Sequence, residues 1–243
     1  MKIKLSILLF LLLLFQSQAQ IIDTTSAVTT QNKLSYKQFI APSVLIGCGF
    51  LLKESMLNKR TQNTIQNLFG EDFNTKIDNL LPSIPIVQIY GGRFFGYTSK
   101  SDWQQQTVNI LISNTITYGI VTSMKHSFKE IRPDASDQYS FPSGHTALAF
   151  TNASLLYYEY KETNIWYASS GFLFATATGI LRIANNKHYT SDVLTGSGIG
   201  LGIGLIVSYW SPFKSLTFTK NKTHALLYPQ VGKYYGMGLV IFK

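Results

Sequence analysis

Beyond the N-terminal segment, five stretches without Asp, Glu, Lys or Arg restrict the fold of this chain most. They contain 15, 22, 13, 19 and 21 residues and run over Gln38–Leu52, Trp103–Met124, Thr146–Tyr158, Thr163–Leu181 and Val193–Phe213. Each could form a helix, and the last two are long enough to span a bilayer, which needs about 20 apolar residues. The second stretch carries several Gln and Asn residues, which favours a helix inside a bundle. The pattern predicts an all-α, membrane-associated bundle of five to six core helices.

Composition narrows the class of partner. Charged residues make up 14% of the chain, against roughly 25% in soluble globular domains. The formal net charge of +9 favours anionic partners such as phosphates and acidic lipids. No Lys/Arg-rich run with interleaved aromatic residues is present, so nucleic acid is not expected as a partner. Cys48 is the single cysteine, which excludes an intrachain disulfide and a cysteine zinc site.

The N-terminus resembles an export signal. Residues 1–4 are basic, Leu5–Phe15 is apolar, and Ser17-Gln18-Ala19 has the small-x-small form of a signal peptidase site. The apolar run has only 11 residues, which is short for a membrane span. Residues 1–19 are therefore predicted to be a signal peptide cleaved after Ala19, or an uncleaved first anchor helix.

Residues 20–213 are predicted to form one helical domain. Between Lys53 and Asp102, Thr61–Phe69 could form an amphipathic helix ending at Gly70. The prolines in Leu81–Pro85 should break the chain, and Val87–Phe95 should resume as a short helix. We expect this region to cover the bundle rather than to form a second domain.

Glycines recur within the last apolar stretch. Gly196, Gly200 and Gly204 are four residues apart, so they share one face of a helix. The order does not match the G-x-G-x-x-G pattern of nucleotide-binding loops. Close helix packing is the better interpretation.

Residues 214–243 change character and are predicted to be a short β-like tail. Leu216–Thr219 and Tyr234–Phe242 favour strands, and Asn221 and Gly232 could supply turns. A hairpin or an irregular tail is expected.

Three clusters of polar residues carry the chemistry. The first is Lys125 with Arg132-Pro133, the second is Pro142-Ser143-Gly144-His145, and the third is Arg182, His188 and Asp192. Each cluster alone is weak evidence, but the three together and in this order are specific.

These residue types suit a phosphate. A phosphoryl group in transfer spreads negative charge over its oxygens, and fixed cations and N–H dipoles stabilise that charge. Lys125, Arg132 and Arg182 would supply three cations. Ser143, Gly144 and His145 would begin a helix whose free N–H groups attract an anion. Gly144 has no side chain to obstruct the approach of the phosphate.

The two histidines would have different roles. His188 and Asp192 are four residues apart and share a face of a helix. A carboxylate bonded to one imidazole nitrogen fixes the tautomer and leaves the other nitrogen free to attack phosphorus. Asp192 would orient His188, the nucleophile, and His145 would protonate the leaving oxygen and later activate water. No cluster of carboxylates suits a metal, so neither a metal nor another cofactor is expected.

The order of the stretches brings the clusters together. Lys125 ends one apolar stretch and His145 precedes the next, while Arg182 ends a third and His188 precedes the fourth. In a bundle whose helices alternate in direction, these points lie at the same end. Asp134 and Asp137 should fix the loop before the second cluster, and Asp134 could also adjust Arg132.

The patterns K-x6-R-P, P-S-G-H and R-x5-H-x3-D resemble the signature of the type 2 phosphatidic acid phosphatase (PAP2) superfamily. The resemblance covers about Lys125–Gly198, and the segment from Arg132 to His145 is similar to bacterial lipid phosphatases. It implies that Lys125, Arg132, Ser143, Gly144 and Arg182 bind phosphate, that His145 is the acid and that His188 is the nucleophile. Leu181 stands where the family usually has Ser, which removes one expected hydrogen bond to phosphate.

The expected function is therefore hydrolysis of a lipid phosphate monoester or pyrophosphate through a phosphohistidine. The substrate and the membrane are the expected partners, and a bacterial inner membrane or periplasm is the expected location. The alternatives are a soluble exported acid phosphatase of broad specificity, a vanadium-dependent haloperoxidase, and a non-catalytic membrane protein that binds an anion. The site is expected to face the periplasm. If Leu5–Phe15 is retained as an anchor, basic residues should lie on the cytoplasmic side, among them Lys53, Lys59, Arg60, Lys76 and Arg93.

Overall fold

Helices make up the chain between residues 34 and 211. The structure is a computed structural model, and it describes residues 34–70, 72–211, 224–230 and 236–242. The α-helices are α2 (Ile40–Lys53), α3 (Met56–Phe69), α4 (Ile84–Gly91), α5 (Trp103–Phe128), α6 (Gly144–Tyr160), α7 (Ile165–Ala184) and α8 (Thr190–Trp210). Short 3-10 turns are η1 (Tyr36–Phe39), η2 (Ile77–Asn79), η3 (Leu81–Ser83) and η4 (Gly92–Phe95). The predicted helical bundle is confirmed, and each charge-free stretch contributes a long helix.

The ends of the helices follow from local sequence. Asp102 caps α5 by accepting a hydrogen bond from the backbone nitrogen of Gln105 at 2.8 Å. Asn164 caps α7 by accepting one from the backbone nitrogen of Tyr167 at 3.0 Å. Such side chains satisfy backbone N–H groups that have no partner within the helix. The helix after Pro142-Ser143 begins at Gly144, as predicted.

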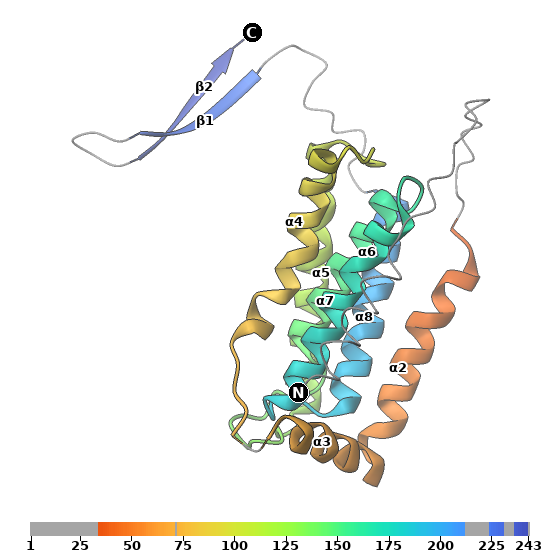
Figure 1. The fold of residues 1–243 in the computed structure, drawn as a ribbon. Coiled ribbons are helices and arrows are strands. Elements are labelled where there is room, and N and C mark those ends of the chain that lie inside the picture. The colour runs from red at the N-terminus through yellow and green to blue at the C-terminus, as the bar shows by residue number, and fades with distance from the viewer. Residues whose placement is uncertain (1–33, 71, 212–223, 231–235, 243) are drawn as a thin grey trace, which may run out of the picture. The chain divides into compact units, whose positions relative to one another are not determined.

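Helix α6 lies at the centre of the bundle. It packs against α5, α7 and α8, and α2 packs against α8 (Figure 1). A Cβ atom at Gly200 would lie 2.2 Å from the carbonyl oxygen of Ala147 on α6, and one at Gly198 would lie 2.6 Å from that of Pro42 on α2. Glycines therefore let α8 approach both neighbours closely, as the predicted packing role requires.

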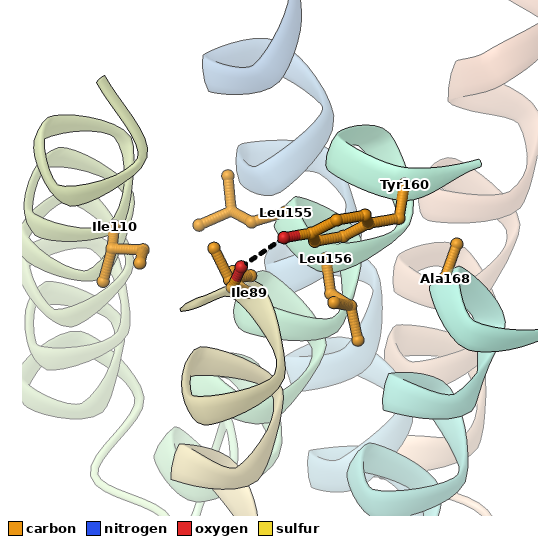
Figure 2. Packing of buried hydrophobic residues seen from close by; sticks show 6 residues of the cluster. All are labelled: Ile89, Ile110, Leu155, Leu156, Tyr160 and Ala168. Atoms are coloured by element: carbon orange, nitrogen blue, oxygen red, sulfur yellow. Dashed lines mark hydrogen bonds between the residues drawn. The ribbon is translucent and has the colours of Figure 1, made fainter. Parts of the chain in front are cut away.

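A small apolar cluster stabilises the end of the bundle where α6 finishes. Figure 2 shows the hydroxyl group of Tyr160 donating a hydrogen bond of 2.6 Å to the carbonyl oxygen of Ile89. Ile110, Leu155, Leu156 and Ala168 complete this buried cluster. It links α4, α5, α6 and α7, and thereby fixes the axes of the helices whose opposite ends carry the polar clusters.

The exterior of the bundle is unusually apolar. Leu51, Leu111 and Leu173, on three different helices, are each more than three-fifths exposed. Among the described helices, α8 is long and apolar enough to cross a membrane, and 61% of its most apolar window is buried. The pair η1–α2 and α3 passes the same test together, although the two are bent by 99°. Helix α7 was also predicted to be long enough to span a membrane, and it has 20 residues. It is not apolar enough to meet the same criterion, because Arg182 and several small polar residues reduce its apolar character.

The region between α2 and α5 departs from prediction in detail. Helix α3 begins at Met56 rather than Thr61, although it ends at Phe69 before Gly70 as expected. Pro82 and Pro85 lie in the first turns of η3 and α4. Proline is tolerated at those positions because their N–H groups have no helical partner. The predicted break is therefore the start of a helix.

The C-terminal residues include a hairpin. Strands β1 (His224–Gln230) and β2 (Gly236–Phe242) pair antiparallel, with His224 opposite Phe242 and Gln230 opposite Gly236. The strand predicted at Tyr234–Phe242 is confirmed in its described part, and β1 was not predicted. Leu216–Thr219, Asn221 and Gly232 lie outside the described residues, as do residues 1–19 and both predicted domain boundaries.

Candidate active site

The loops at one end of the bundle bring the three polar clusters together, as predicted. The backbone nitrogen of Ser143 donates a hydrogen bond of 3.0 Å to the carbonyl oxygen of Asp192. The backbone nitrogen of Asp134 donates to the carbonyl oxygen of Asn186 at 3.1 Å. The loops before α6 and before α8 are thus joined through their backbones.

His188 is held between an acid and a cation. Its side chain is 1% exposed, Nδ1 lies 3.2 Å from Oδ2 of Asp192, and Nε2 lies 3.2 Å from Nη1 of Arg132. A carboxylate only accepts hydrogen bonds and a guanidinium only donates them. The two contacts therefore assign the proton to Nδ1 and leave a lone pair on Nε2. Burial and the nearby Arg182, Lys125 and Arg132 charges hold the pKa of His188 well below its usual value.

Ser140 is a site residue that the sequence analysis missed. Its hydroxyl group donates a 2.5 Å hydrogen bond to Oδ2 of Asp192, and the backbone nitrogen of Tyr189 donates to the same oxygen at 2.9 Å. These bonds fix the carboxylate that contacts His188. The position of Ser140 just before the second motif was the one sequence feature that could have identified it as a site residue.

Arg132 is oriented by Asp137. Its Nε atom lies 2.7 Å from Oδ1 of Asp137, and Nη1 donates to the carbonyl oxygen of Lys187 at 3.1 Å. Asp134 pairs instead with Lys187. Both aspartates fix the loop as expected, but the interpretation of Asp134 as a partner of Arg132 was wrong, because Asp137 has that position.

Lys125 points into the same loop. Its Nζ atom donates to the carbonyl oxygens of Tyr139 and, at 3.3 Å, of Ser140. Burial, followed by the positive charge of Arg132, lowers the pKa of Lys125 to about 8. An anion bound nearby would oppose both effects and favour the charged amine.

Arg182 has a partner far away in the sequence. Its Nη1 atom lies 2.8 Å from Oδ2 of Asp78, a carboxylate with a side chain only 1% exposed. Asn185 also donates to this oxygen at 3.0 Å. No sequence pattern pointed to Asp78, because it lies outside the three motifs.

The start of α6 carries the second motif. Ser143 is fully buried, and its hydroxyl oxygen lies 2.9 Å from that of Thr146. A Cβ atom at Gly144 would make only ordinary contact, 3.5 Å from Cγ1 of Val121. Burial and the charge of Arg182 lower the pKa of His145 to about 4. A histidine with this pKa is neutral near pH 7.

No group of three or more His, Cys, Asp or Glu side chains that could hold a metal ion occurs within the described ranges.

The comparisons with known proteins agree with the motifs. Residues 106–216 match the family model of the PAP2 superfamily. This segment belongs to the PAP2 superfamily. It includes all eight residues that the sequence predicted for the site, whereas Asp78 lies outside the PAP2 segment.

Two curated relatives are similar over part of their length. A lipid A 1-phosphatase from Porphyromonas gingivalis is 37% identical over 164 residues, which cover 66% of this chain and 37% of the relative. A PA-phosphatase related-family protein from Dictyostelium discoideum is 28% identical over 163 residues, covering 57% of this chain and 59% of the relative. This chain therefore spans less than two thirds of either relative.

Two solved structures are also similar. LpxE from Aquifex aeolicus is 23% identical with a TM-score of 0.48, covering 64% of this chain and 96% of that chain. A transmembrane PAP2-type phosphatidylglycerolphosphate phosphatase from Bacillus subtilis is 17% identical with a TM-score of 0.48, covering 71% and 92%.

The site lies at the same end as several basic residues that were expected on the opposite side. Nζ of Lys53 lies 3.2 Å from Oε2 of Glu130, in the loop that leads to Arg132. Helix α3, which carries Lys59 and Arg60, contacts the residues beside His188, and Lys76 adjoins η2 near Arg182. Arg93 alone of the five lies toward the start of α5. The predicted separation of these charges from the site was wrong, because α2 ends beside the site.

Proposed function

We propose that this protein hydrolyses a phosphate monoester or pyrophosphate of a lipid, without a metal, through a phosphohistidine on His188. The observation that carries the proposal is the position of His188. Its Nε2 lone pair faces Arg132 while Nδ1 contacts Asp192. An imidazole held in this way is a nucleophile once a bound phosphate draws the Arg132 guanidinium to its own oxygens and releases the Nε2 lone pair.

The proposed reaction has two steps. The negative charge of the bound phosphate favours the protonated form of His145. Nε2 of His188 forms a bond to phosphorus while the bond from phosphorus to the leaving oxygen breaks, and the protonated His145 gives that oxygen its proton. Water then attacks the phosphohistidine, His145 takes a proton from that water, and orthophosphate leaves as Nε2 is regenerated. Lys125, Arg132, Arg182 and the N–H groups of Ser143 and Gly144 stabilise the charge on the phosphoryl oxygens.

The bundle supports a lipid as the substrate. Its outer surface exposes large apolar side chains, and α8 is long enough to cross a membrane. A phosphate at the end of such a bundle lies at the depth of a lipid headgroup, so the site would act on lipids in the membrane around it. The relative named as a lipid A 1-phosphatase makes the phosphate of lipid A the first substrate to test.

A panel assay tests this function. The purified protein in detergent is given lipid A, phosphatidic acid, phosphatidylglycerol phosphate and a polyprenyl pyrophosphate, each with excess EDTA. We expect phosphate release from at least one lipid, inhibition by vanadate, and acid-labile phosphate on His188 after rapid quenching. A folded protein that releases no phosphate from any of them, or that needs a divalent metal, would contradict the proposal.

A second comparison separates a lipid phosphatase from the soluble acid phosphatase considered above. Contacts with the lipid tail should raise kcat/KM, because binding energy away from the phosphorus can stabilise the transition state. Long-chain monoesters should exceed matched short-chain ones by at least about tenfold, or roughly 1.4 kcal/mol. Equal efficiency in one detergent condition would favour the soluble enzyme.

A further inference from the structure

Helix α3 lies across the end of the bundle that carries the site. It follows α2 after two residues and is bent by 99° from it (Figure 1). If α2 runs along the membrane normal with the rest of the bundle, α3 lies parallel to the plane of the bilayer. It has 14 residues, or about 21 Å at the rise of an α-helix.

One side of α3 is polar, buried and bonded to the loop that carries His188. Asn58 is 2% exposed and makes two hydrogen bonds with Ser191, from Nδ2 to Oγ and from the Ser191 backbone nitrogen to Oδ1, both 2.9 Å. Nε2 of Gln62 donates to Oδ1 of Asn186 at 2.5 Å, on the other side of His188. Helix α3 therefore holds this loop at two points, one before and one after His188.

The remaining surface of α3 has the opposite character. Leu57 is 56% exposed and Leu68 is 78% exposed. They are eleven positions apart, or about three turns, so they lie on the same flank. Lys59 and Arg60 are also exposed, and α3 contains no acidic residue. A helix in water usually buries its apolar residues, whereas the buried residues of α3 are polar and its exposed surface carries both apolar and basic side chains.

A bilayer surface explains both sides of this helix. The boundary between headgroups and acyl chains accepts apolar side chains on one flank of a helix and attracts basic ones through anionic lipids. Leu51, at the end of α2, is 82% exposed and continues the apolar surface toward α3.

We propose that α3 is an interfacial helix that binds the surface of a bilayer containing anionic lipids, and that this contact positions the loop carrying His188. Leu57 and Leu68 lie among the upper acyl chains, and Lys59 and Arg60 lie among the headgroups. The bilayer holds α3 in place, and Asn58 and Gln62 pass this constraint to Ser191 and Asn186. The coupling of α3 to the loop that carries His188 rests on the proposed function, whereas the placement of α3 at the bilayer surface does not.

Depth measurements test the placement without any need for activity. In a C48S background, single cysteines replace Leu57, Leu68 or Asn63, an exposed polar residue of the same helix, and carry a fluorophore in proteoliposomes. We expect lipids brominated in the upper acyl chain to quench the labels at 57 and 68, and aqueous iodide to quench the label at 63. Equal quenching of all three labels by iodide would overturn the placement.

Lipid composition tests the role of charge. Quenching of the label at 57 by brominated lipids should be stronger in vesicles with phosphatidylglycerol than in pure phosphatidylcholine. The K59Q/R60Q double variant should remove the difference. If quenching of the label at 57 is equal in the two lipid compositions while Lys59 and Arg60 are intact, anionic lipids are not the partner.

Turnover tests the coupling. The L57Q/L68Q double variant should lose about tenfold in kcat for a long-chain substrate in proteoliposomes, while turnover of a short-chain phosphate in detergent is unchanged. The matched control is L111Q, because Leu111 is 62% exposed on α5, away from α3. An equal loss in L111Q, or no loss in the double variant, would overturn the coupling. Absence of turnover in the wild type would contradict the proposed function but leave the depth result intact.

Discussion

Nη1 of Arg132 lies 3.2 Å from Nε2 of His188, on the opposite side of the ring from Asp192. The same arginine is fixed through Nε by Asp137. The cation is thus oriented by one carboxylate and the imidazole by another. This arrangement keeps the Nε2 lone pair directed at the point where an anion would lie against Arg132.

Replacing His188 should remove the reaction rather than weaken it. H188A should abolish phosphate release because no other described side chain occupies its position between Asp192 and Arg132. D192N should retain measurable turnover, since it keeps the imidazole but disturbs its tautomer. Initial rates on the best lipid substrate, with thermal unfolding as a control for folding, test this order. Substantial turnover in H188A would exclude His188 as the nucleophile.

Asp137 and Asp134 form a matched pair of loop carboxylates. D137N should raise KM and weaken inhibition by vanadate, by about three- to tenfold, because it loses the charged contact that orients Arg132. D134N loses the charged contact with Lys187 but leaves Arg132 paired with Asp137, so its effect should be smaller. Michaelis constants and vanadate inhibition constants for the two variants provide the measurement. A larger effect in D134N would contradict the assignment.

Two glycines of α8 should respond oppositely to alanine. G200A would place a Cβ atom 2.2 Å from the carbonyl oxygen of Ala147, so α8 and α6 would have to separate, whereas a Cβ atom at Gly202 meets only Pro42 at 3.7 Å. We expect G200A to lower the melting temperature by several degrees. G202A should leave it unchanged or raise it, because alanine favours a helix by about 1 kcal/mol over glycine. Thermal unfolding in one detergent tests the pair, and equal melting temperatures for both variants would refute the close contact.

Acidification should destabilise the protein through His145. Burial and Arg182 lower its pKa to about 4 in the folded state, and an unfolded histidine has a pKa of about 6.5. Between these values the unfolded chain binds more protons, so the free energy of unfolding decreases as the pH falls from 6.5 toward 4. At pH 5 the loss should be about 1–2 kcal/mol, allowing for solvent screening.

The H145Q variant isolates this contribution, because glutamine does not titrate. Melting temperatures of both proteins at pH 7.5 and pH 5 give the comparison. H145Q should lose less stability than the wild type on acidification. An identical loss in both proteins would mean that another group is responsible.

The helical architecture and the meeting of the three polar clusters at one end followed from the amino-acid sequence alone. Five charge-free stretches predicted α2, α5, α6, α7 and α8, and alternating helix direction predicted that Lys125, His145, Arg182 and His188 would meet at one end. Those predictions succeeded because they depend on length, apolar character and chain order, which are local or nearly local properties.

The groups that orient the site residues became visible only in the packed fold. Asp78 pairs with Arg182, and α3 reaches Asn186 and Ser191, across more than a hundred residues in each case. The path of the loop places Asp137, rather than Asp134, against Arg132. The side of the bundle on which the basic residues lie was likewise set by where α2 ends. Such contacts depend on how separate helices pack, and no periodicity or motif spacing encodes the distance between side chains that the fold alone brings together.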